Sequence, residues 1–266
     1  MPSIQPQKIG QNSIGCAAIP WPDSMTSIPL QISDISVIIP TLNEETQISR
    51  WCDLLPPKGN RSTGATEASM PGEIIIVDGG SSDRTVALAR SHGFWVEISK
   101  PGRGTQLNHG ARLASGRILL FLHADTRLPP DFAGPLLDCL NQTPAIAGAF
   151  RLKIEDAGLR LRFICFCANL RSRFLHLPYG DQAIFIRRDD FQRLGGFPET
   201  MIMEDFIFIK RAKREGRITT LPLSVTTSAR RWQQKGIFRT TLINQLVILG
   251  FYARIPLVKL TSLYRR

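Results

Sequence analysis

Four short apolar runs constrain the fold of this chain more than any other feature. They are ISVIIP at 35–40, EIIIVD at 73–78, FWVEIS at 94–99 and RILLFLHAD at 117–125. Each has the length of a buried strand and is rich in β-branched residues or leucine. Segments with helical spacing and capping residues separate the runs. This alternation predicts an α/β fold with a mostly parallel sheet and helices on both of its faces.

The same strands deliver polar residues to one edge of the predicted sheet. Ligands of open parallel sheets bind outside the carboxyl ends of the strands, so we expect Pro40, Asp78 and Asp125 to converge there. After Asp78, two glycines allow close approach of a ligand, and the helix start that follows favours phosphate. Taken alone, this segment is equally well interpreted as a capped turn between a strand and a helix.

Composition predicts how the rest of the chain is organised. We expect residues 1–33 to form a loosely ordered extension and the Pro-, Gly-, Ser- and Thr-rich residues 57–71 to form a surface insertion. Residues 34–232 are the predicted main domain, and 233–266 an amphipathic helical segment. Further strands are expected at AIAGAFRLKI, QAIFIRR and RITTLP, and further helices at GLRLRFICFCANLRSRFLHL, DDFQRLGGFPE and EDFIFIKRAKREG.

The formal charge of the 266-residue chain is +11, which suits nucleic acid, an anionic membrane surface or a phosphorylated substrate. No recognised nucleic-acid-binding module accompanies this charge, so nucleic acid is not an expected partner. The five cysteines lack zinc-ligand spacing, which indicates reduced thiols in a cytoplasmic protein. The N-terminus has no secretory pattern, and no apolar run reaches the roughly 20 residues of a membrane-spanning helix.

Two basic, apolar stretches, Leu159–Leu177 and Leu242–Arg266, have the composition of surfaces that lie against lipid. Packing against the protein core explains their apolar residues equally well. The arginines that flank both stretches slightly favour lipid contact, so the expected location is the cytoplasm, with a peripheral position on the inner face of the cell membrane as the alternative.

Six motifs occur in an order that resembles a known family. They are SVIIPTLNEE, IIIVDGGSSDRT, GRGTQLNHGARLASGRILLFLHADT, YGDQAIFIRR, LGGFPE and MEDFIFIKR. From about Ile35 to Trp232 the chain resembles the inverting family-2 glycosyltransferases, which have the Rossmann-like GT-A fold. Within that family it resembles a bacterial branch described as associated with radical-SAM proteins, whose relatives include glycosyltransferases of acidic carotenoids.

The resemblance implies a nucleotide-diphospho-sugar donor, with a UDP-sugar preferred. It places the nucleotide beside the first strand, the turn after Asp78 and the Gly-rich loop near residue 103. The implied donor-binding residues are Pro40, Thr41, Asn43, Glu44, Asp78, Gly79, Asp83, Arg103, Gln106, Asn108, His123 and Ala124.

The resemblance also implies a divalent metal, Mg²⁺ or Mn²⁺, bound by Asp125. His123 stands where the family usually has an acid. Imidazole suits Mg²⁺ poorly, so we expect it to contact the ribose or support the site rather than ligate the metal. Asp205 is the implied catalytic base and Glu204 its positioning residue. The implied acceptor or diphosphate contacts are Gly180, Asp181, Gln182, Arg231 and Trp232.

The acceptor implied by the resemblance is a hydroxyl or carboxyl group, with a lipid-like or carotenoid molecule slightly preferred. Three other functions stay open at this point. A nucleotidyltransferase has a related fold, but its Gly-rich, lysine-containing signature is not found here. A nucleic-acid-binding module would account for the charge alone. A catalytically inactive sugar-nucleotide-binding protein would account for His123.

Overall fold

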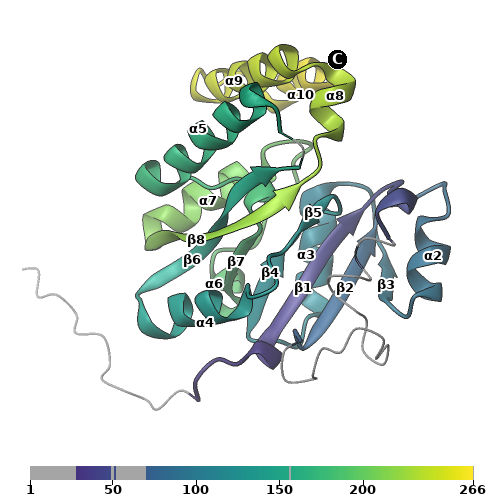
Figure 1. Ribbon diagram of the computed structural model, residues 1–266, viewed down its shortest axis with the longest axis vertical. Coiled ribbons are helices and arrows are strands. Elements are labelled where there is room, and N and C mark those ends of the chain that lie inside the picture. Colours follow the sequence, from purple (N-terminus) through teal and green to yellow (C-terminus); the bar gives the residue numbers. More distant parts are fainter. Residues whose placement is uncertain (1–27, 49–50, 52–69, 156, 266) are drawn as a thin grey trace, which may run out of the picture.

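Strands β1 (Ile35–Thr41), β2 (Glu73–Asp78), β3 (Trp95–Ile98) and β4 (Ile118–Phe121) form the parallel half of a sheet, with β1 between β2 and β4. The computed structural model describes residues 28–48, 51, 70–155 and 157–265. The register pairs Thr41 with Asp78, so the residues that end β1 and β2 lie side by side. The predicted parallel direction is confirmed for this half, whose strand order is β3-β2-β1-β4 (Figure 1).

The second half of the sheet mixes strand directions. Strand β7 (Ile184–Arg187) runs antiparallel to β4 and to β6 (Ala145–Ile154), and β6 runs parallel to β8 (Arg217–Thr227). A two-residue strand, β5 (Thr126–Arg127), pairs with the end of β8. In the part of the chain that the structure describes, the order is β3-β2-β1-β4-β7-β6-β8-β5. The fold is therefore α/β with a mostly parallel sheet, as expected.

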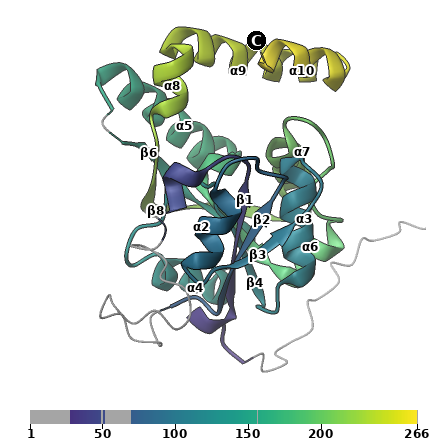
Figure 2. The ribbon, with the colours of Figure 1, turned by 90° about the vertical axis from the view of Figure 1, so that its right-hand side faces the viewer.

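Both faces of the sheet are covered by helices (Figure 2). Alternate residues of the central strands divide between the two faces. Ile39 belongs to one hydrophobic cluster and Ile38 to the other. The first cluster includes residues of α2 (Thr85–Ser91) and α4 (Ala133–Gln142). The second includes residues of α3 (Arg103–Leu113), α6 (Arg188–Arg193) and α7 (Glu204–Glu215). This two-sided burial explains why the strands read as continuous apolar runs.

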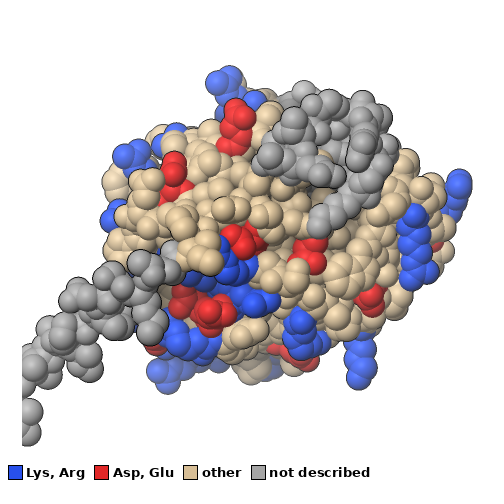
Figure 3. All heavy atoms as spheres, turned by 90° about the horizontal axis from the view of Figure 1, so that it is seen from below, with Lys and Arg blue, Asp and Glu red and all other residues tan. Residues whose placement is uncertain are grey.

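The remaining helices gather at the end of the molecule toward which β1 and β2 point (Figure 1). Helix α5 (Leu159–Leu175) packs on β6 through Leu161 and Cys165. Helices α8 (Arg230–Lys235), α9 (Ile237–Tyr252) and α10 (Leu257–Arg265) follow β8. At the opposite end of the molecule, the described acidic and basic side chains are interspersed (Figure 3). Among the described residues, no helix combines the length and the apolar character needed to cross a bilayer.

The structure differs from the sequence-based expectations in several places. Helix α4 and strand β5 were not expected, and β8 continues beyond the predicted RITTLP run. Residues 28–33, predicted to belong to a loosely ordered extension, are held to the domain. There the Leu30 amide donates to the Asn141 side chain at 3.0 Å, and Asn141 donates back to the Leu30 carbonyl at 3.2 Å. The predicted insertion lies almost entirely outside the described residues.

Candidate active site at the carboxyl edge of the sheet

Asp78 ends β2 as a fully buried carboxylate whose oxygens are both occupied by the protein itself. Oδ1 accepts from the amides of Gly80 at 2.9 Å and Ser81 at 2.7 Å. Oδ2 accepts from the Ser81 hydroxyl at 2.5 Å and from Thr41 Oγ1 at 3.0 Å. These bonds fix the turn that carries Gly79 and join it to the end of β1. A contact between Asp78 and a nucleotide base, as expected from the sequence, would have to replace one of these bonds.

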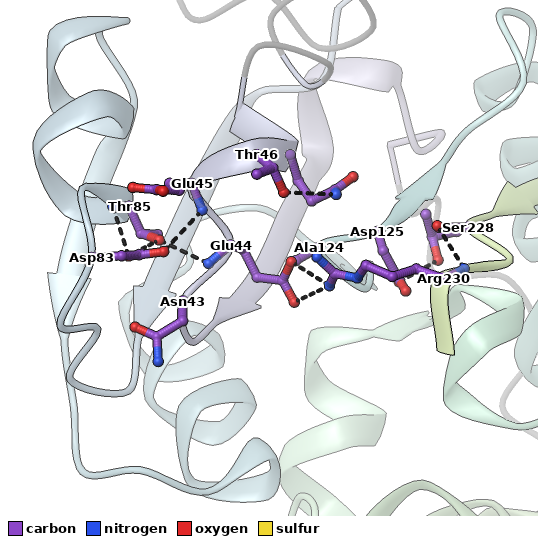
Figure 4. A network of polar contacts seen from close by, with 12 residues as sticks. Asn43, Glu44, Glu45, Thr46, Asp83, Thr85, Ala124, Asp125, Ser228 and Arg230 are labelled. Carbon is purple, nitrogen blue, oxygen red and sulfur yellow. Dashed lines mark hydrogen bonds and ion pairs between the residues drawn. The ribbon is translucent and has the colours of Figure 1, made fainter. Parts of the chain in front are cut away.

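The loop after β1 is bonded to the turn after β2 (Figure 4). Asn43, in the left-handed region at φ 56°, accepts from the Ser82 amide at 2.9 Å. The amide of Glu44 donates to the Thr85 hydroxyl at 2.8 Å. Burial by itself would raise the pKa of Asp83, but hydrogen bonds from Thr85 and the Glu45 amide hold it below its usual value. The loop residues predicted to bind the donor are therefore brought together, with Pro40 leading into them at the end of β1.

Gln106 and Asn108 of α3 bind backbone groups rather than the open edge of the sheet. Gln106 Nε2 donates at 2.8 Å to the carbonyls of both Thr41 and Val77. The Asn108 amide group donates to the Phe197 carbonyl at 2.8 Å and accepts from the Phe197 amide at 2.9 Å. Gln106 leaves little room above Gly79, since a Cβ built there would lie 3.1 Å from its side chain. Both residues hold α3 in place, which the sequence did not reveal.

Arg103 begins α3 and lies opposite Glu204, the first residue of α7. Its Nη1 is 3.3 Å from Glu204 Oε1, and the Arg103 side chain is 47% exposed while that of Glu204 is 3% exposed. Burial, together with the neighbouring Asp205 charge, raises the pKa of Glu204, and Arg103 partly offsets this. Arg103 thus neutralises a buried acid while about half of its own side chain stays exposed.

Asp205, Gly180 and His123 converge on one point. The Gly180 amide donates to Asp205 Oδ2 at 2.5 Å, and the Phe206 amide donates to Asp205 Oδ1 at 2.7 Å. A Cβ built on Gly180 would lie 2.8 Å from His123 Nε2 and 3.0 Å from Asp205 Oδ2. A small cavity of about 10 Å³ lies among these side chains, Arg103 and Glu204. The carboxylate of Asp205 is thereby oriented by two backbone donors beside an imidazole.

Asp181 adds a buried carboxylate next to this group, in the short helix η4 (Gly180–Gln182). Burial, with contributions from the charges of Asp205 and Asp125, raises its pKa to about 6, although Arg171 acts in the opposite direction. Within the described residues, its buried Oδ1 has no hydrogen-bond partner. Gln182, in contrast, is satisfied, because it donates to the Phe150 carbonyl at 2.9 Å and accepts from Arg171 at 3.2 Å. Asp181 is the predicted acceptor residue that is open to a new partner.

Asp125 follows β4 and is only weakly held. Its Oδ1 receives long contacts from the hydroxyls of Thr126 at 3.4 Å and Thr227 at 3.5 Å. The preceding carbonyl, of Ala124, accepts the Trp51 indole N–H at 2.5 Å. No group of three or more His, Cys, Asp and Glu that could hold a metal occurs among the described residues. A half-buried carboxylate with capacity to spare fits a hard divalent cation as its single protein ligand.

Glu44 connects this region to the helices after β8 (Figure 4). Arg230 Nη2 lies 3.0 Å from Glu44 Oε1 and 2.7 Å from Oε2. Burial raises the pKa of Glu44, Arg230 lowers it, and the charges of Asp125 and Asp83 raise it further. The sequence drew attention to Arg231 instead, whose side chain lies outside the described residues. The arginine pair preceding Trp232 was the available signal, and its first member, Arg230, binds Glu44.

The resemblance implies that Trp232 contacts the acceptor, and a buried aromatic residue in a basic loop was the alternative interpretation. In the structure it packs with Ala229 and Ile237 against Leu161 and Cys165 of α5. Within the described part of the chain, its buried indole N–H has no partner. Trp232 therefore anchors α8 to α5, and the aromatic residue in this motif serves packing.

The chain is similar in sequence to a large family of transferases. A profile described as Glycosyl transferase family 2 matches residues 36–195. An undecaprenyl-phosphate 4-deoxy-4-formamido-L-arabinose transferase of Sodalis glossinidius (strain morsitans) is 26% identical over 168 residues, which are 60% of this chain and 49% of that protein. The chain spans about half the length of the curated relatives it matches.

Solved structures share the fold. Glucosyl-3-phosphoglycerate synthase of Mycobacterium tuberculosis, with Mn²⁺, UDP and glucosyl-3-phosphoglycerate, is 22% identical with a TM-score of 0.53, over 71% of this chain and 70% of that one. A mannosyltransferase of Pyrobaculum calidifontis, with GDP-Man and Mn²⁺, is 21% identical with a TM-score of 0.57, over 80% and 62%. These likenesses confirm the GT-A fold. Because the family profile covers more than half of the chain, the protein belongs to glycosyl transferase family 2.

Proposed function

We propose that the protein transfers a sugar, with inversion, from a nucleotide-diphospho-sugar to a hydroxyl or carboxyl acceptor. The acceptor we favour is a lipid-like or carotenoid molecule, in line with the resemblance to the radical-SAM-associated branch. The observation that carries the proposal is the arrangement around Asp205. Two backbone donors orient its carboxylate beside His123, within the electrostatic reach of Asp181. An oriented carboxylate at the ligand edge of an α/β sheet suits general-base catalysis.

In the proposed step, Asp205 accepts the proton of the acceptor hydroxyl. The acceptor oxygen forms a bond to the anomeric carbon as the bond from that carbon to the diphosphate oxygen breaks. The nucleoside diphosphate leaves on the opposite face, which inverts the anomeric centre. Glu204, held by Arg103 at 3.3 Å, keeps the start of α7 and its Asp205 in position. For a carboxyl acceptor, the attacking oxygen is already ionised, so the step needs no proton transfer to Asp205.

We propose that Asp125 holds a divalent cation, Mg²⁺ or Mn²⁺, together with donor phosphate oxygens and water. When bound, the cation neutralises charge that grows on the leaving diphosphate. Arg230 lies next to Asp125 through its pair with Glu44 and adds positive charge to the same region. Because one protein carboxylate is a weak site by itself, we expect low metal affinity in the absence of donor. Tight Mn²⁺ binding to the free protein would contradict this assignment.

Relatives support a sugar-nucleotide donor. The solved structures named above hold UDP in one case and GDP-Man in the other, each with Mn²⁺. The test is a thermal-stability screen of UDP-, GDP- and dTDP-sugars with and without Mn²⁺. A donor at a hundredfold excess over its dissociation constant should stabilise the protein by about 2.7 kcal/mol. If no nucleotide sugar raises the melting temperature with metal present, the donor assignment fails.

A variant of the base separates binding from chemistry. Asp205→Asn should keep the donor-dependent rise in melting temperature and lose transfer to a hydroxyl acceptor or hydrolysis of the donor. The matched control is Asp131→Asn, which changes an exposed carboxylate before α4. Full turnover by Asp205→Asn would remove Asp205 from the role of base. Donor binding without turnover by the wild-type protein, across acceptor classes, would favour a sugar-nucleotide-binding protein instead.

A further inference from the structure

Exposed apolar side chains are concentrated on α5, α9 and α10. Among the described residues, 18 large hydrophobic side chains are strongly exposed, and 13 of them lie on these helices or on the link between α9 and α10. Isolated surface hydrophobics need no explanation, but a contiguous group of this size marks a binding surface. The group consists of Leu159, Phe163, Phe166, Leu170, Phe174, Leu175, Phe238, Leu242, Leu246, Leu249, Tyr252, Ile255 and Val258.

Helix α5 has two apolar faces. Its inner face uses Leu161 and Cys165 to pack against β6. Its outer residues Leu159, Phe163, Phe166, Leu170 and Phe174 recur at intervals of three or four, so they form one stripe along the helix. Phe163 is 66% and Phe166 61% exposed. A helix that covers only a core has polar residues on its outer face, so the packing within this chain does not account for the stripe.

Helix α9 continues the same surface. Its residues Val247 and Gly250 are buried, whereas Phe238, Leu242 and Leu249 point outward. The guanidinium carbon of Arg160, near the start of α5, lies 5.2 Å from the Phe238 ring centroid, near the start of α9. Figures 1 and 2 agree that α5 and α9 lie at the same end of the molecule. We call the outer faces of α5, α9 and α10 the α5–α9 surface.

The excess positive charge of the chain lies on the same helices as the exposed apolar side chains. Residues 157–179 and 228–266 contain 12 of the 33 Lys and Arg and none of the 22 Asp and Glu. The other 21 cations are balanced by the 22 acids, so the whole positive surplus belongs to α5, α8–α10 and their links. Exposed cations on them include Arg162, Arg173 and Lys259. At the opposite end, acids and bases are interspersed (Figure 3).

A basic groove borders the end of α9. It has a volume of about 620 Å³ and is lined by Lys210 and Arg214 of α7 and by Arg254 after α9. The exposed side chains of Tyr252 and Ile255 form its apolar side. A phospholipid presents an anionic phosphate next to hydrocarbon. The cations of this groove and the exposed apolar side chains beside it are complementary to those two parts.

We propose that the α5–α9 surface binds peripherally to an anionic lipid bilayer. The apolar stripes would enter the region between head groups and acyl chains, while the flanking cations pair with anionic head groups. A second copy of the chain is a poorer occupant, because a symmetric contact would face cations with cations and these segments offer no acid as a counterpart. The inference stands on the surface alone and does not depend on the proposed sugar transfer.

The test is flotation of the full chain with vesicles, without donor. We expect binding to vesicles of phosphatidylcholine mixed with phosphatidylglycerol, little binding to phosphatidylcholine alone, and loss of binding at high salt. The double variants Phe163→Gln/Phe166→Gln and Arg162→Glu/Arg173→Glu should each weaken binding at least about tenfold. Their matched controls are Trp95→Gln/Ile98→Gln, exposed on the edge strand β3, and Arg90→Glu/Lys100→Glu, exposed beside it.

The variants alter exposed side chains, so their melting temperatures should stay close to that of the wild type, which is checked first. Equal binding by test and control variants would overturn the proposal, as would failure of the wild type to float with anionic vesicles. A concentration-dependent dimer that Phe163→Gln/Phe166→Gln abolishes, without vesicle binding, would assign the surface to a second copy instead. A donor-induced rise in melting temperature that survives in the non-floating variants would separate this surface from the donor site.

Discussion

Arg230 binds both carboxylate oxygens of Glu44, at 3.0 and 2.7 Å, and so joins the first helix after β8 to the loop after β1. The two residues are 186 positions apart in the sequence. Glu44 lies among other acids, since the charges of Asp125 and Asp83 raise its pKa in addition to burial. Arg230 is thus the cation that lets this acid stay ionised close to the proposed metal ligand.

Arg230→Ala should destabilise the protein in a pH-dependent manner. Without Arg230 the pKa of Glu44 in the folded protein rises further above its unfolded-state value. A protein that contains such an acid loses stability as the pH rises between these two pKa values, because the acid must then ionise in an unfavourable site. We expect a loss of about 1 kcal/mol at about pH 7.5, reduced for solvent exposure of the pair, and a smaller loss at about pH 4.5. Denaturant unfolding at both pH values measures it, with Arg90→Ala on α2 as control. Equal losses at the two pH values would contradict the role of the pair.

Gly180→Ala should abolish most activity. The added methyl group would lie 2.8 Å from His123 Nε2 and 3.0 Å from Asp205 Oδ2, so one of these groups must move. Displacing a catalytic carboxylate by about 1 Å lowers turnover on the order of 100-fold. Gly134→Ala in α4 is the matched control, because nothing lies within 4 Å of its Cβ position and alanine favours a helix. Steady-state kinetics at saturating donor tests this, and wild-type turnover by Gly180→Ala would refute it.

Asp181→Asn should make the free energy of unfolding less dependent on pH in the acidic range. The folded protein keeps the Asp181 proton up to a pKa of about 6, against an ordinary value of 3.8, so stability falls as pH rises between these values. The asparagine variant lacks this slope and should be more stable than the wild type near neutral pH by about 1 to 3 kcal/mol. Melting temperatures across this pH range provide the measurement, with Asp131→Asn as control. A variant less stable than the wild type at neutral pH would show that the charge of Asp181 is compensated.

Gln106→Met should lower stability without weakening donor binding. In the variant, the carbonyls of Thr41 and Val77 lose the hydrogen bonds that Gln106 Nε2 donates to them at 2.8 Å. This loss should lower the free energy of unfolding by about 1 to 3 kcal/mol. Gln142→Met, on the exposed face of α4, is the control for the change in side-chain chemistry. Denaturant unfolding and donor titration calorimetry measure the two quantities separately. A large loss of donor affinity with unchanged stability would return Gln106 to the donor site.

Periodicity and residue type were sufficient to predict the parallel half of the sheet. Strands β1, β2 and β4 are apolar on both faces, which only a covered sheet explains, and α7 carries a clear helical pattern after its acidic start. The insertion of β7 between β4 and β6 could not be predicted, because strand order depends on long-range pairing rather than local spacing. Helix α4 was not predicted although Leu136, Leu137 and Leu140 recur near helical spacing, and Gly134 and Pro135 near its start are typical of a loop.

The sequence predicted that polar residues at several strand ends converge at one edge of the sheet, but it did not predict which groups the individual residues bind. Asp205, Gly180 and His123 meet because the end of β4 and the starts of η4 and α7 lie at the same edge. The bonds of Gln106 and Asn108 to distant carbonyls leave no trace in the sequence, since any amide side chain reads as a candidate ligand. The pairing of Arg230 with Glu44 could not be predicted, because it depends on how the first helix after β8 packs beside the loop after β1.

The concentration of positive charge on α5 and α8–α10 makes the molecule an electric dipole whose positive pole lies at the end shown uppermost in Figure 1. A body of this kind rotates in the field of a charged plane before any atom touches it. The field extends only about 8 to 10 Å at physiological ionic strength, which is close to the diameter of one helix. Reorientation is therefore confined to the final approach, and immobilisation on a polyanionic support should leave the opposite end of every molecule facing solvent.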